Sequence, residues 1–424
     1  MQLLCLSNGH GEDAIAVRIC QELQLHKTAP ELVALPLVGE GYAYSQLGIP
    51  IIGPVQTMPS GGFIYMEGQQ LLRDVRGGLL QLTLAQFKAV RRWSKQGGVV
   101  LAVGDIVPLL FAWLSGADYA FVGTAKSEYY LRDEAGRLPN RPALEGWSGS
   151  VYHPWERWLM SQRRCKAVFP RDTLTAETLQ QWSIPAFDLG NPMMDGIELD
   201  NSAPIFYQPD AEIKELQRSL VVTLLPGSRP PEAEENWKVI IRAVAELLDS
   251  FSERSLLFLG AIAPALSFDQ LRRVLEAYGW HQQAKVASNT EVEDPEAIAF
   301  TQKNATLVLT KNAYNDCLIK ADLAIAMAGT ATEQFVGLGK PAIAIPGKGP
   351  QFTPAFAEAQ TRLLGPSLVL VQEPAAVAAT VHSLLRDPDR LHLIAENGRR
   401  RLGKPGAAKR IADCLIKGFG KEHR

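Results

Sequence analysis

The sequence predicts an α/β protein built from two Rossmann-like domains. The chain has 424 residues, which is more than one ordinary core holds, so two domains of roughly 200 residues each are expected. Each half also opens in the same way, with a short apolar run, a polar loop that contains glycine, and an amphipathic helix. These units cover residues 2–23 in the first half and residues 220–251 in the second half. Strand–loop–helix units of this kind are typical of parallel sheets covered by helices.

The two halves are joined by a segment with the composition of a linker. Residues 201–210 contain two prolines and show no periodicity, which is typical of a connection between domains. We therefore expect an N-terminal domain over residues 1–200 and a C-terminal domain over residues 211–400. Residues 401–424 are expected to form a C-terminal helix that packs back on the N-terminal domain.

The composition argues against several classes of protein. With 46% hydrophobic residues, 21% charged residues and a net charge of −2, the chain is expected to be globular and to bind no nucleic acid. The five cysteines are scattered without metal or redox spacing, so we expect no metal, no cofactor and a cytoplasmic location. The sequence has no basic leader and no apolar run of about 18 residues, so we expect no signal peptide, no transmembrane helix and at most peripheral membrane contact.

Two polar residues follow apolar strands of the first half, at the position where open α/β sheets bind ligands. His10 lies in the glycine loop 7–13 after the first strand, and Asp105 follows the strand at 99–103. Histidine titrates near neutral pH, and a carboxylate at a strand end is well placed to accept a proton, so both are candidate catalytic bases. A structural histidine and a helix-capping aspartate are the alternatives.

The second half carries a first loop suited to phosphate directly after the strand at 220–225. This loop contains Gly227, Ser228 and Arg229 and leads into a helix. Backbone N–H groups at a helix N-terminus attract anions, and a guanidinium can bind phosphate through two hydrogen bonds. A surface turn with a solvated arginine is the alternative.

A second loop suited to a nucleotide follows the apolar run at 322–328. Gly329 permits a sharp turn and close approach of a ligand, and Thr330 or Thr332 can cap the next helix, with Ala331 between them. Glu333 lies in the first helical turn, where an acidic residue can accept hydrogen bonds from a ribose diol. The alternative is an ordinary strand–turn–helix.

Residues 58–95 differ in character from the rest of the first half because apolar and basic residues interleave there. This composition is typical of an interfacial helix on an anionic bilayer. A helix buried between domains with basic ends in solvent is the alternative. The residues predicted to contact a membrane or a lipid acceptor are Phe63, Tyr65, Met66, Arg73 and Arg76.

Several motifs together resemble the lipid-A-disaccharide synthase family of GT-B glycosyltransferases, or a related sister group. The segments that carry the resemblance are 224–229, 329–333, 189–193, 104–108 and 58–76. The match covers most of the chain and is strongest after residue 224. In 189–193 the family usually has histidine where Asn191 stands here. The glycine–histidine loop at 7–13 is instead similar to that of peptidoglycan and diacylglycerol glycosyltransferases. Gln351 is similar to a sugar-contact residue of the same enzymes.

The resemblance implies a GT-B fold, in which two Rossmann-like domains face each other across a cleft. It implies a hexosyltransferase of lipid A biosynthesis that transfers a GlcNAc-type sugar from a UDP-sugar to a lipid-linked acceptor, with inversion and without metal. The partners implied are the UDP-sugar donor, the lipid acceptor and the inner face of the cytoplasmic membrane. Gly227 to Arg229, Gly329 to Glu333 and Gln351 would bind the donor, and His10 or Asp105 would act as the base.

Two other functions remain open. A UDP-sugar epimerase uses the same two-domain fold, but it needs paired carboxylates and no lipid acceptor site, and the mixed apolar and basic stretch at 58–93 argues against it. A non-catalytic regulator that binds a sugar nucleotide would keep Arg229 and Glu333 and would need neither His10 nor Asp105. An assay with labelled UDP-GlcNAc separates the three, because the label is transferred, changed or only bound.

Overall fold

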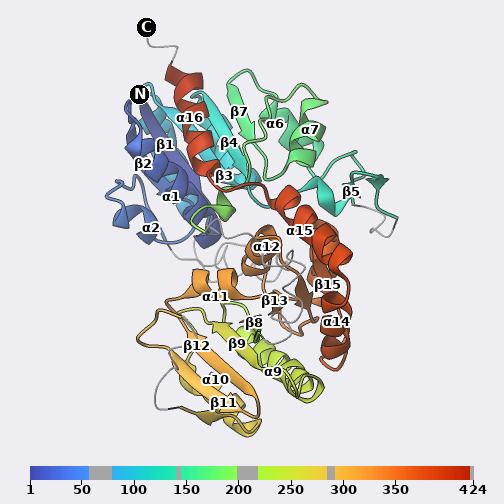
Figure 1. The fold of residues 1–424 in the computed structure, drawn as a ribbon. Coiled ribbons are helices and arrows are strands. Elements are labelled where there is room, and N and C mark those ends of the chain that lie inside the picture. The colour runs from blue at the N-terminus through green and yellow to red at the C-terminus, as the bar shows by residue number, and fades with distance from the viewer. Residues whose placement is uncertain (57–78, 140–144, 198–217, 284–291, 421–424) are drawn as a thin grey trace. The chain divides into compact units, whose positions relative to one another are not determined.

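The computed structural model divides into two compact units, each with its own sheet (Figure 1). Unit 1 comprises residues 1–195 and 404–424, and unit 2 comprises residues 196–403. The expected linker at 201–210 lies outside the described residues. The residues that the structure describes are 1–56, 79–139, 145–197, 218–283 and 292–420.

Unit 1 is built on a five-stranded parallel sheet with the order β2-β1-β3-β4-β7. Its strands are nearly continuous apolar runs, because side chains on both faces of a parallel sheet are covered by helices. The strands are β1 (Gln2–Ser7), β2 (Glu31–Pro36), β3 (Val99–Gly104), β4 (Tyr119–Gly123) and β7 (Cys165–Phe169), and a small hairpin pairs β5 (Arg132–Asp133) with β6 (Gly136–Arg137). The helices are α1 (His10–Leu25), α2 (Tyr42–Gln46), α4 (Leu79–Ser94), α5 (Ile106–Ser115), α6 (Pro154–Met160), α7 (Thr173–Gln180) and α16 (Ala407–Phe419).

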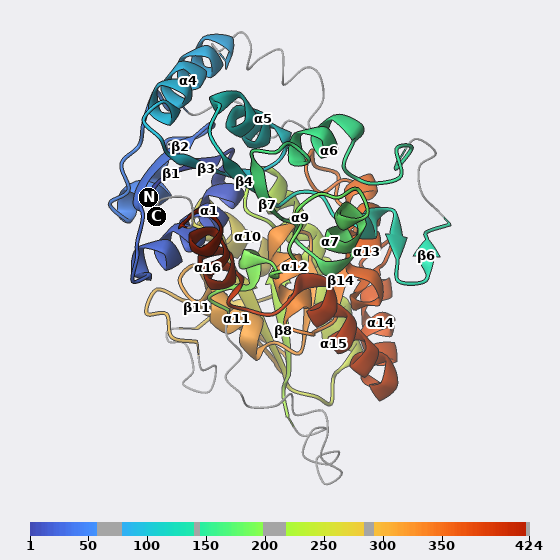
Figure 2. The same cartoon turned by 90° about the horizontal axis from the view of Figure 1, so that it is seen from above.

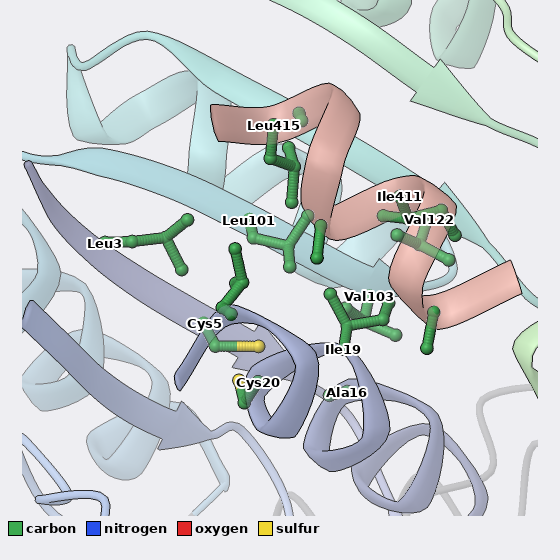
Figure 3. Packing of buried hydrophobic residues seen from close by; sticks show 14 of the residues in the cluster. Leu3, Cys5, Ala16, Ile19, Cys20, Leu101, Val103, Val122, Ile411 and Leu415 are labelled. Carbon is green, nitrogen blue, oxygen red and sulfur yellow. The ribbon is translucent and has the colours of Figure 1, made fainter. Parts of the chain in front are cut away.

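Each face of this sheet has its own core, since successive residues of a strand point to opposite sides. Leu3 and Cys5 of β1 pack with α1 and α16 (Figure 3), whereas Leu4 and Leu6 pack with α4 and α5 on the other face. The last helix of the chain is therefore part of the core of unit 1. Asp195 fixes its start, because the carboxylate accepts hydrogen bonds from the first N–H groups of α16 and the residue before it.

Unit 2 is built on an eight-stranded sheet with the order β10-β11-β12-β9-β8-β13-β14-β15. The strands from β12 to β15 in this order are parallel, and β11 and β10 extend one edge in antiparallel fashion. The strands are β8 (Leu220–Leu225), β9 (Leu256–Ala261), β10 (His281–Gln282), β11 (Ile298–Gln302), β12 (Ala305–Thr310), β13 (Leu323–Ala326), β14 (Ala342–Ala344) and β15 (Leu368–Leu370). The helices are α9 (Glu232–Ser250), α10 (Phe268–Ala277), α11 (Tyr314–Lys320), α12 (Thr330–Gly337), α13 (Pro354–Leu364), α14 (Ala376–Leu385) and α15 (Pro388–Leu402).

Each sheet has a point where the direction of its connections reverses. In unit 1 the chain passes from β1 to β2 on one side and later reaches β3 on the other side of β1. In unit 2 it passes from β8 to β9 and later reaches β13 on the other side of β8. We call the carboxyl ends of β1 and β3 the unit 1 switch point, and those of β8 and β13 the unit 2 switch point. Ligands of open α/β sheets bind at such points, and the predicted α/β class with Rossmann-like domains is confirmed.

Candidate active site

The two catalytic candidates of the first half both fall at the unit 1 switch point. His10 begins α1 directly after β1, and its side chain lies outside the described part of the structure. Asp105 follows β3 and caps α5, because its Oδ1 accepts a hydrogen bond from the N–H of Val107 at 2.8 Å. The helix-cap role considered from the sequence is therefore present. It leaves the second carboxylate oxygen available for other partners.

Asn8 and Gly104 bring the loops after β1 and β3 into direct contact. Gly104 has a φ of +134°, and a Cβ at this position would lie 2.0 Å from Oδ1 of Asn8. A residue with a side chain would therefore both strain the backbone and displace Asn8. The side chain of Asn8 is buried and hydrogen bonds to Asp105. The two loops thus form one surface.

Burial is the main influence on the titration of Asp105. It raises the pKa of the carboxyl group, and hydrogen bonds from Val107 and Asn8 partly offset the rise. The charge of Glu156 raises the pKa further, and the charge of Lys126 lowers it. These two residues form a partly buried ion pair with an Nζ–Oε2 distance of 2.5 Å. Asp105 therefore retains a proton at higher pH than an ordinary aspartate.

The structure adds two carboxyl groups that were not among the candidates, Glu12 and Asp13. A Cβ at Gly104 would lie 3.3 Å from Cγ of Glu12, so this side chain passes beside the loop that holds Asp105. Asp13 is only 4% exposed, and its Oδ1 accepts a hydrogen bond from Oγ of Ser7 at 2.5 Å. Burial first and the charge of Glu12 next raise the pKa of Asp13 to about 7. Both residues belong to the loop 7–13, whose acidic end was the available signal.

The phosphate-type loop of the second half lies at the unit 2 switch point and touches the second predicted loop. Gly227 has a φ of +100°, and a Cβ there would lie 3.3 Å from the carbonyl oxygen of Met327. The backbones after β8 and β13 therefore approach each other closely. Ser228 and Arg229 continue the first loop toward α9. The structure thus brings together two motifs separated by about a hundred residues.

The start of α12 differs in one detail from the expectation. Gly329 is the N-cap residue, and neither threonine provides a side-chain cap. The hydroxyl of Thr332 instead donates to the carbonyl oxygen of Ala328 at 2.5 Å, because it lies one turn into the helix and faces backwards. Thr330 is exposed and Ala331 half-buried. Glu333 is buried in the first turn.

A third loop, between β14 and α13, reaches the same switch point. The N–H groups of Gln351 and Phe352 donate to the carboxylate of Glu232, the first residue of α9. The amide of Gln360 donates to the carbonyl oxygens of Ala328 and Gly329. Gln351 is therefore brought to the loops that hold the other predicted donor residues.

The predicted membrane residues lie outside the described part of the chain, but the helices that follow them expose apolar side chains. Helices α4, α5 and α6 pack side by side (Figure 2). None of the described helices is long and apolar enough to cross a bilayer. The described residues also contain no group of three or more histidines, cysteines or carboxylates arranged to hold a metal ion. The predicted residues outside the description are Phe63, Tyr65, Met66, Arg73 and Arg76.

Comparison with known proteins relates the chain to solved structures of enzymes that act on UDP-sugars. A UDP-GlcNAc 2-epimerase from Neisseria meningitidis bound to UDP-GlcNAc is 15% identical, with a TM-score of 0.52 over 98% of this chain and 100% of that chain. MurG from Acinetobacter baumannii, a GT-B glycosyltransferase, is 16% identical, with a TM-score of 0.57 over 98% and 99%. The S. aureus MnaA–UDP structure is 14% identical, with a TM-score of 0.53 over 99% and 97%. No protein-family model and no curated protein sequence matches the chain.

These similarities confirm the GT-B fold and correct the predicted function. Several of the similar structures with a TM-score above 0.5 are UDP-GlcNAc 2-epimerases. The prediction of lipid-A-disaccharide synthase activity is therefore wrong, and the epimerase alternative is the better supported of the two. The error has a physical reason: the motifs 224–229 and 329–333 form loops and helix starts at the unit 2 switch point, and one fold with such loops carries different activities.

Proposed function

We propose that this chain is an enzyme that epimerises a UDP-bound sugar, with UDP-GlcNAc as the first substrate to test. The observation that carries the proposal is the group of carboxyl side chains at the unit 1 switch point. Glu12 and Asp105 flank Gly104 there, and Asp13 is buried next to Glu12 in the sequence, where its carboxylate accepts a hydrogen bond from Ser7 at the end of β1. Paired carboxylates are the feature that the epimerase alternative requires.

Unit 2 would bind the nucleotide. The N–H groups around Gly227 and Ser228 and the guanidinium of Arg229 would hold the diphosphate. The start of α12, from Gly329 to Thr332, would add the positive end of its helix dipole. Glu333 would accept hydrogen bonds from the ribose hydroxyls, and Gln351 would lie near the sugar.

Unit 1 would supply the proton transfers. Epimerisation at C2 requires one group to take the C2 proton while the C–H electron pair forms a double bond to C1 and expels UDP from C1. A second group then returns a proton to the other face of C2 as UDP adds back to C1. Two carboxyl groups can share this work when their surroundings separate their pKa values. Burial raises the pKa of Asp105, which suits it to the acid role, and Glu12 or His10 would be the base. The net proton balance of the reaction is zero.

The test is incubation of the purified protein with UDP-GlcNAc in D₂O, followed by NMR. An epimerase converts the sugar to its C2 epimer and incorporates deuterium at the inverted carbon, since the removed proton exchanges with solvent. UDP-GlcNAc that binds but keeps its configuration and its C2 proton would instead identify a sugar-nucleotide-binding regulator and overturn the proposal.

We further propose that unit 1 contacts a membrane through a surface that we call the α4–α6 surface. Trp158 of α6 packs against Trp113 of α5 with a ring-centroid distance of 5.2 Å, yet remains about half exposed. Exposed leucines and tryptophans on adjacent helices are typical of interfacial contact. The members of the surface are Leu80, Leu84, Leu110, Leu114, Trp155 and Trp158.

The charges beside this surface favour an anionic bilayer. Lys88, Arg91 and Arg92 lie on α4, and neither α4 nor α5 contains an acidic residue. Basic residues near an apolar surface add an attraction to anionic lipids that salt screens. Helix α4 would thus supply both exposed leucines and the basic side chains that attract anionic lipid.

Vesicle flotation tests this contact. Wild-type protein should float with anionic vesicles and be partly released by high salt, and a Leu84→Asp, Trp158→Asp double variant should lose most of this binding. Leu25→Asp is the control, because Leu25 is also exposed but belongs to α1. Equal flotation of the double variant and the wild type would contradict the proposal.

A further inference from the structure

The first two turns of α9 present two buried polar side chains to the loops of the unit 2 switch point. Glu232 and Asn236 are four residues apart and so lie on one face of the helix. Glu232 is 8% exposed and Asn236 is 3% exposed. Buried polar side chains cost free energy unless their hydrogen bonds are satisfied. The hydrogen bonds of Glu232 and Asn236 therefore explain why these two polar side chains can be buried here.

Asn236 joins the loops after β8 and β13. Its Nδ2 donates to the carbonyl oxygen of Pro226 at 3.0 Å and to that of Met327 at 3.4 Å. One side-chain amide thus holds the carbonyl groups of two loops that lie a hundred residues apart. A Cβ at Gly347 would lie 3.1 Å from Oδ1 of Asn236, so the loop after β14 also passes beside this side chain.

Glu232 holds the loop after β14. Both carboxylate oxygens accept from the N–H of Gln351 at 3.1 Å, and Oε1 also accepts from the N–H of Phe352 at 2.6 Å. Hydrogen bonds to a charged acceptor are stronger than those between neutral groups. A Cβ at Gly349 would lie 2.3 Å from Cδ of Glu232, so the loop can approach the carboxylate only because glycine stands there.

We propose that Glu232 and Asn236 act as a clamp, a pair of positioning residues that hold the loops after β8, β13 and β14 in the arrangement that binds the nucleotide. The inference rests on the nucleotide-binding part of the proposed function and adds the residues that set its geometry. Neither residue needs to touch the ligand. The loops would bind a diphosphate through their backbone N–H groups, and the directions of these groups follow the loop conformation. The affinity for a ligand with a diphosphate therefore depends on the clamp.

The first test compares Glu232→Gln with Glu235→Gln. Glu235 lies in the same first turn of α9 but is exposed and pairs with Lys238 at 2.6 Å. Both variants remove one negative charge from the same helix end, so only the clamp differs. Glu232→Gln should raise amide hydrogen exchange in residues 346–353 and weaken UDP binding about tenfold in calorimetry, which is the usual effect of losing charged hydrogen bonds. Glu235→Gln should change neither.

A second variant disturbs the clamp from the loop side. Gly349→Ala pushes a methyl group against Glu232 and leaves α9 unchanged, so it tests the clamp even if Glu232→Gln folds poorly. It should weaken UDP binding by a similar factor.

In the C2-inversion assay Glu232→Gln and Gly349→Ala should both raise KM and leave kcat nearly unchanged. A purely structural role would instead lower the melting temperature and leave UDP affinity intact.

The outcomes separate the clamp from the proposed reaction. Unchanged UDP affinity in both variants overturns the clamp, whether or not loop exchange rises. Wild-type protein that binds UDP but does not invert C2 overturns the reaction, and the binding comparison still tests the clamp. Wild-type protein that does not bind UDP overturns both.

Discussion

The two switch points have the same topology and opposite chemistry. At each one, loops follow two neighbouring parallel strands and lead into a helix. In unit 1 these loops gather Glu12, Asp13 and Asp105, and burial raises the pKa of both aspartates. In unit 2 they gather glycines, backbone N–H groups and Arg229. The fold thus determines where a site lies, and the residues of each loop determine whether it suits proton transfer or anion binding.

The largest expected effect is on turnover and concerns the unit 1 switch point. Asp105→Asn keeps an oxygen that can accept from Val107, so α5 should remain capped. It removes the titratable proton, so turnover of UDP-GlcNAc should fall roughly 10²–10⁴-fold, the usual contribution of a general acid or base. UDP affinity should not change. Steady-state kinetics and calorimetry measure the two quantities.

Asp118 provides the control for this variant. It directly precedes β4, at the amino ends of the strands and so away from the switch point, and it pairs with Lys166 at 3.3 Å. Asp118→Asn should retain normal turnover. Near-normal turnover of Asp105→Asn would remove the assigned chemical role from the unit 1 switch point.

The next effect is on stability and concerns Asp13. Its pKa is about 7 in the folded protein and near 3.8 in the unfolded chain. Between these values the folded state binds more protons than the unfolded state, so the free energy of unfolding should fall as pH rises from about 4 to 7 and then level off. Asp13→Asn should remove this slope and stabilise the protein at pH 8 by at most roughly 4 kcal/mol.

Denaturant unfolding at several pH values measures this slope. In Asp105→Asn the free energy of unfolding should still fall between pH 4 and 7, because the contribution of Asp13 remains and only that of Asp105 is removed. An identical pH dependence in Asp13→Asn and wild type would show that Asp13 is ionised in the fold. The contrast in chemistry between the two switch points would then be weaker.

The smallest effect is on nucleotide affinity and concerns the unit 2 switch point. Arg229→Ala and Glu333→Ala should each weaken UDP binding about tenfold, because a charged hydrogen bond contributes roughly 1.5–3 kcal/mol. Arg242→Ala, on an exposed position of α9, should have no effect. Calorimetry with UDP checks all three, and wild-type affinity in both site variants would contradict the anion-binding role of this switch point.

The local parts of the site could be predicted from the sequence. Apolar runs followed by glycine loops identified the strands β1, β3, β8 and β13 and the loops after them. Asp105 and Gly329 were expected at strand ends and occur there. These features depend on a few consecutive residues, so their periodicity and turn residues are visible in the chain itself.

Burial and reaction type could not be predicted in the same way. The raised pKa of Asp13 could not be predicted, because it comes mainly from burial, which depends on the packing of α1 on the sheet. The charge of Glu12 adds to the rise, and the hydrogen bond from Ser7 opposes it. The transferase prediction failed because a fold and its loop motifs do not specify the reaction. That choice depends on groups elsewhere in the fold.

The sequence by itself determined the α/β class and the positions of the loops, since hydrophobic runs, glycines and helix starts act over a few residues. The tertiary structure decided which loops meet. The strand order places the loop of Asn8 beside Asp105, and Glu232 reaches Gln351 across a separation of 119 residues. The physical reason is that a parallel sheet joins strands by long crossovers, so neighbours at its carboxyl edge are distant in the chain and no local pattern records their contact.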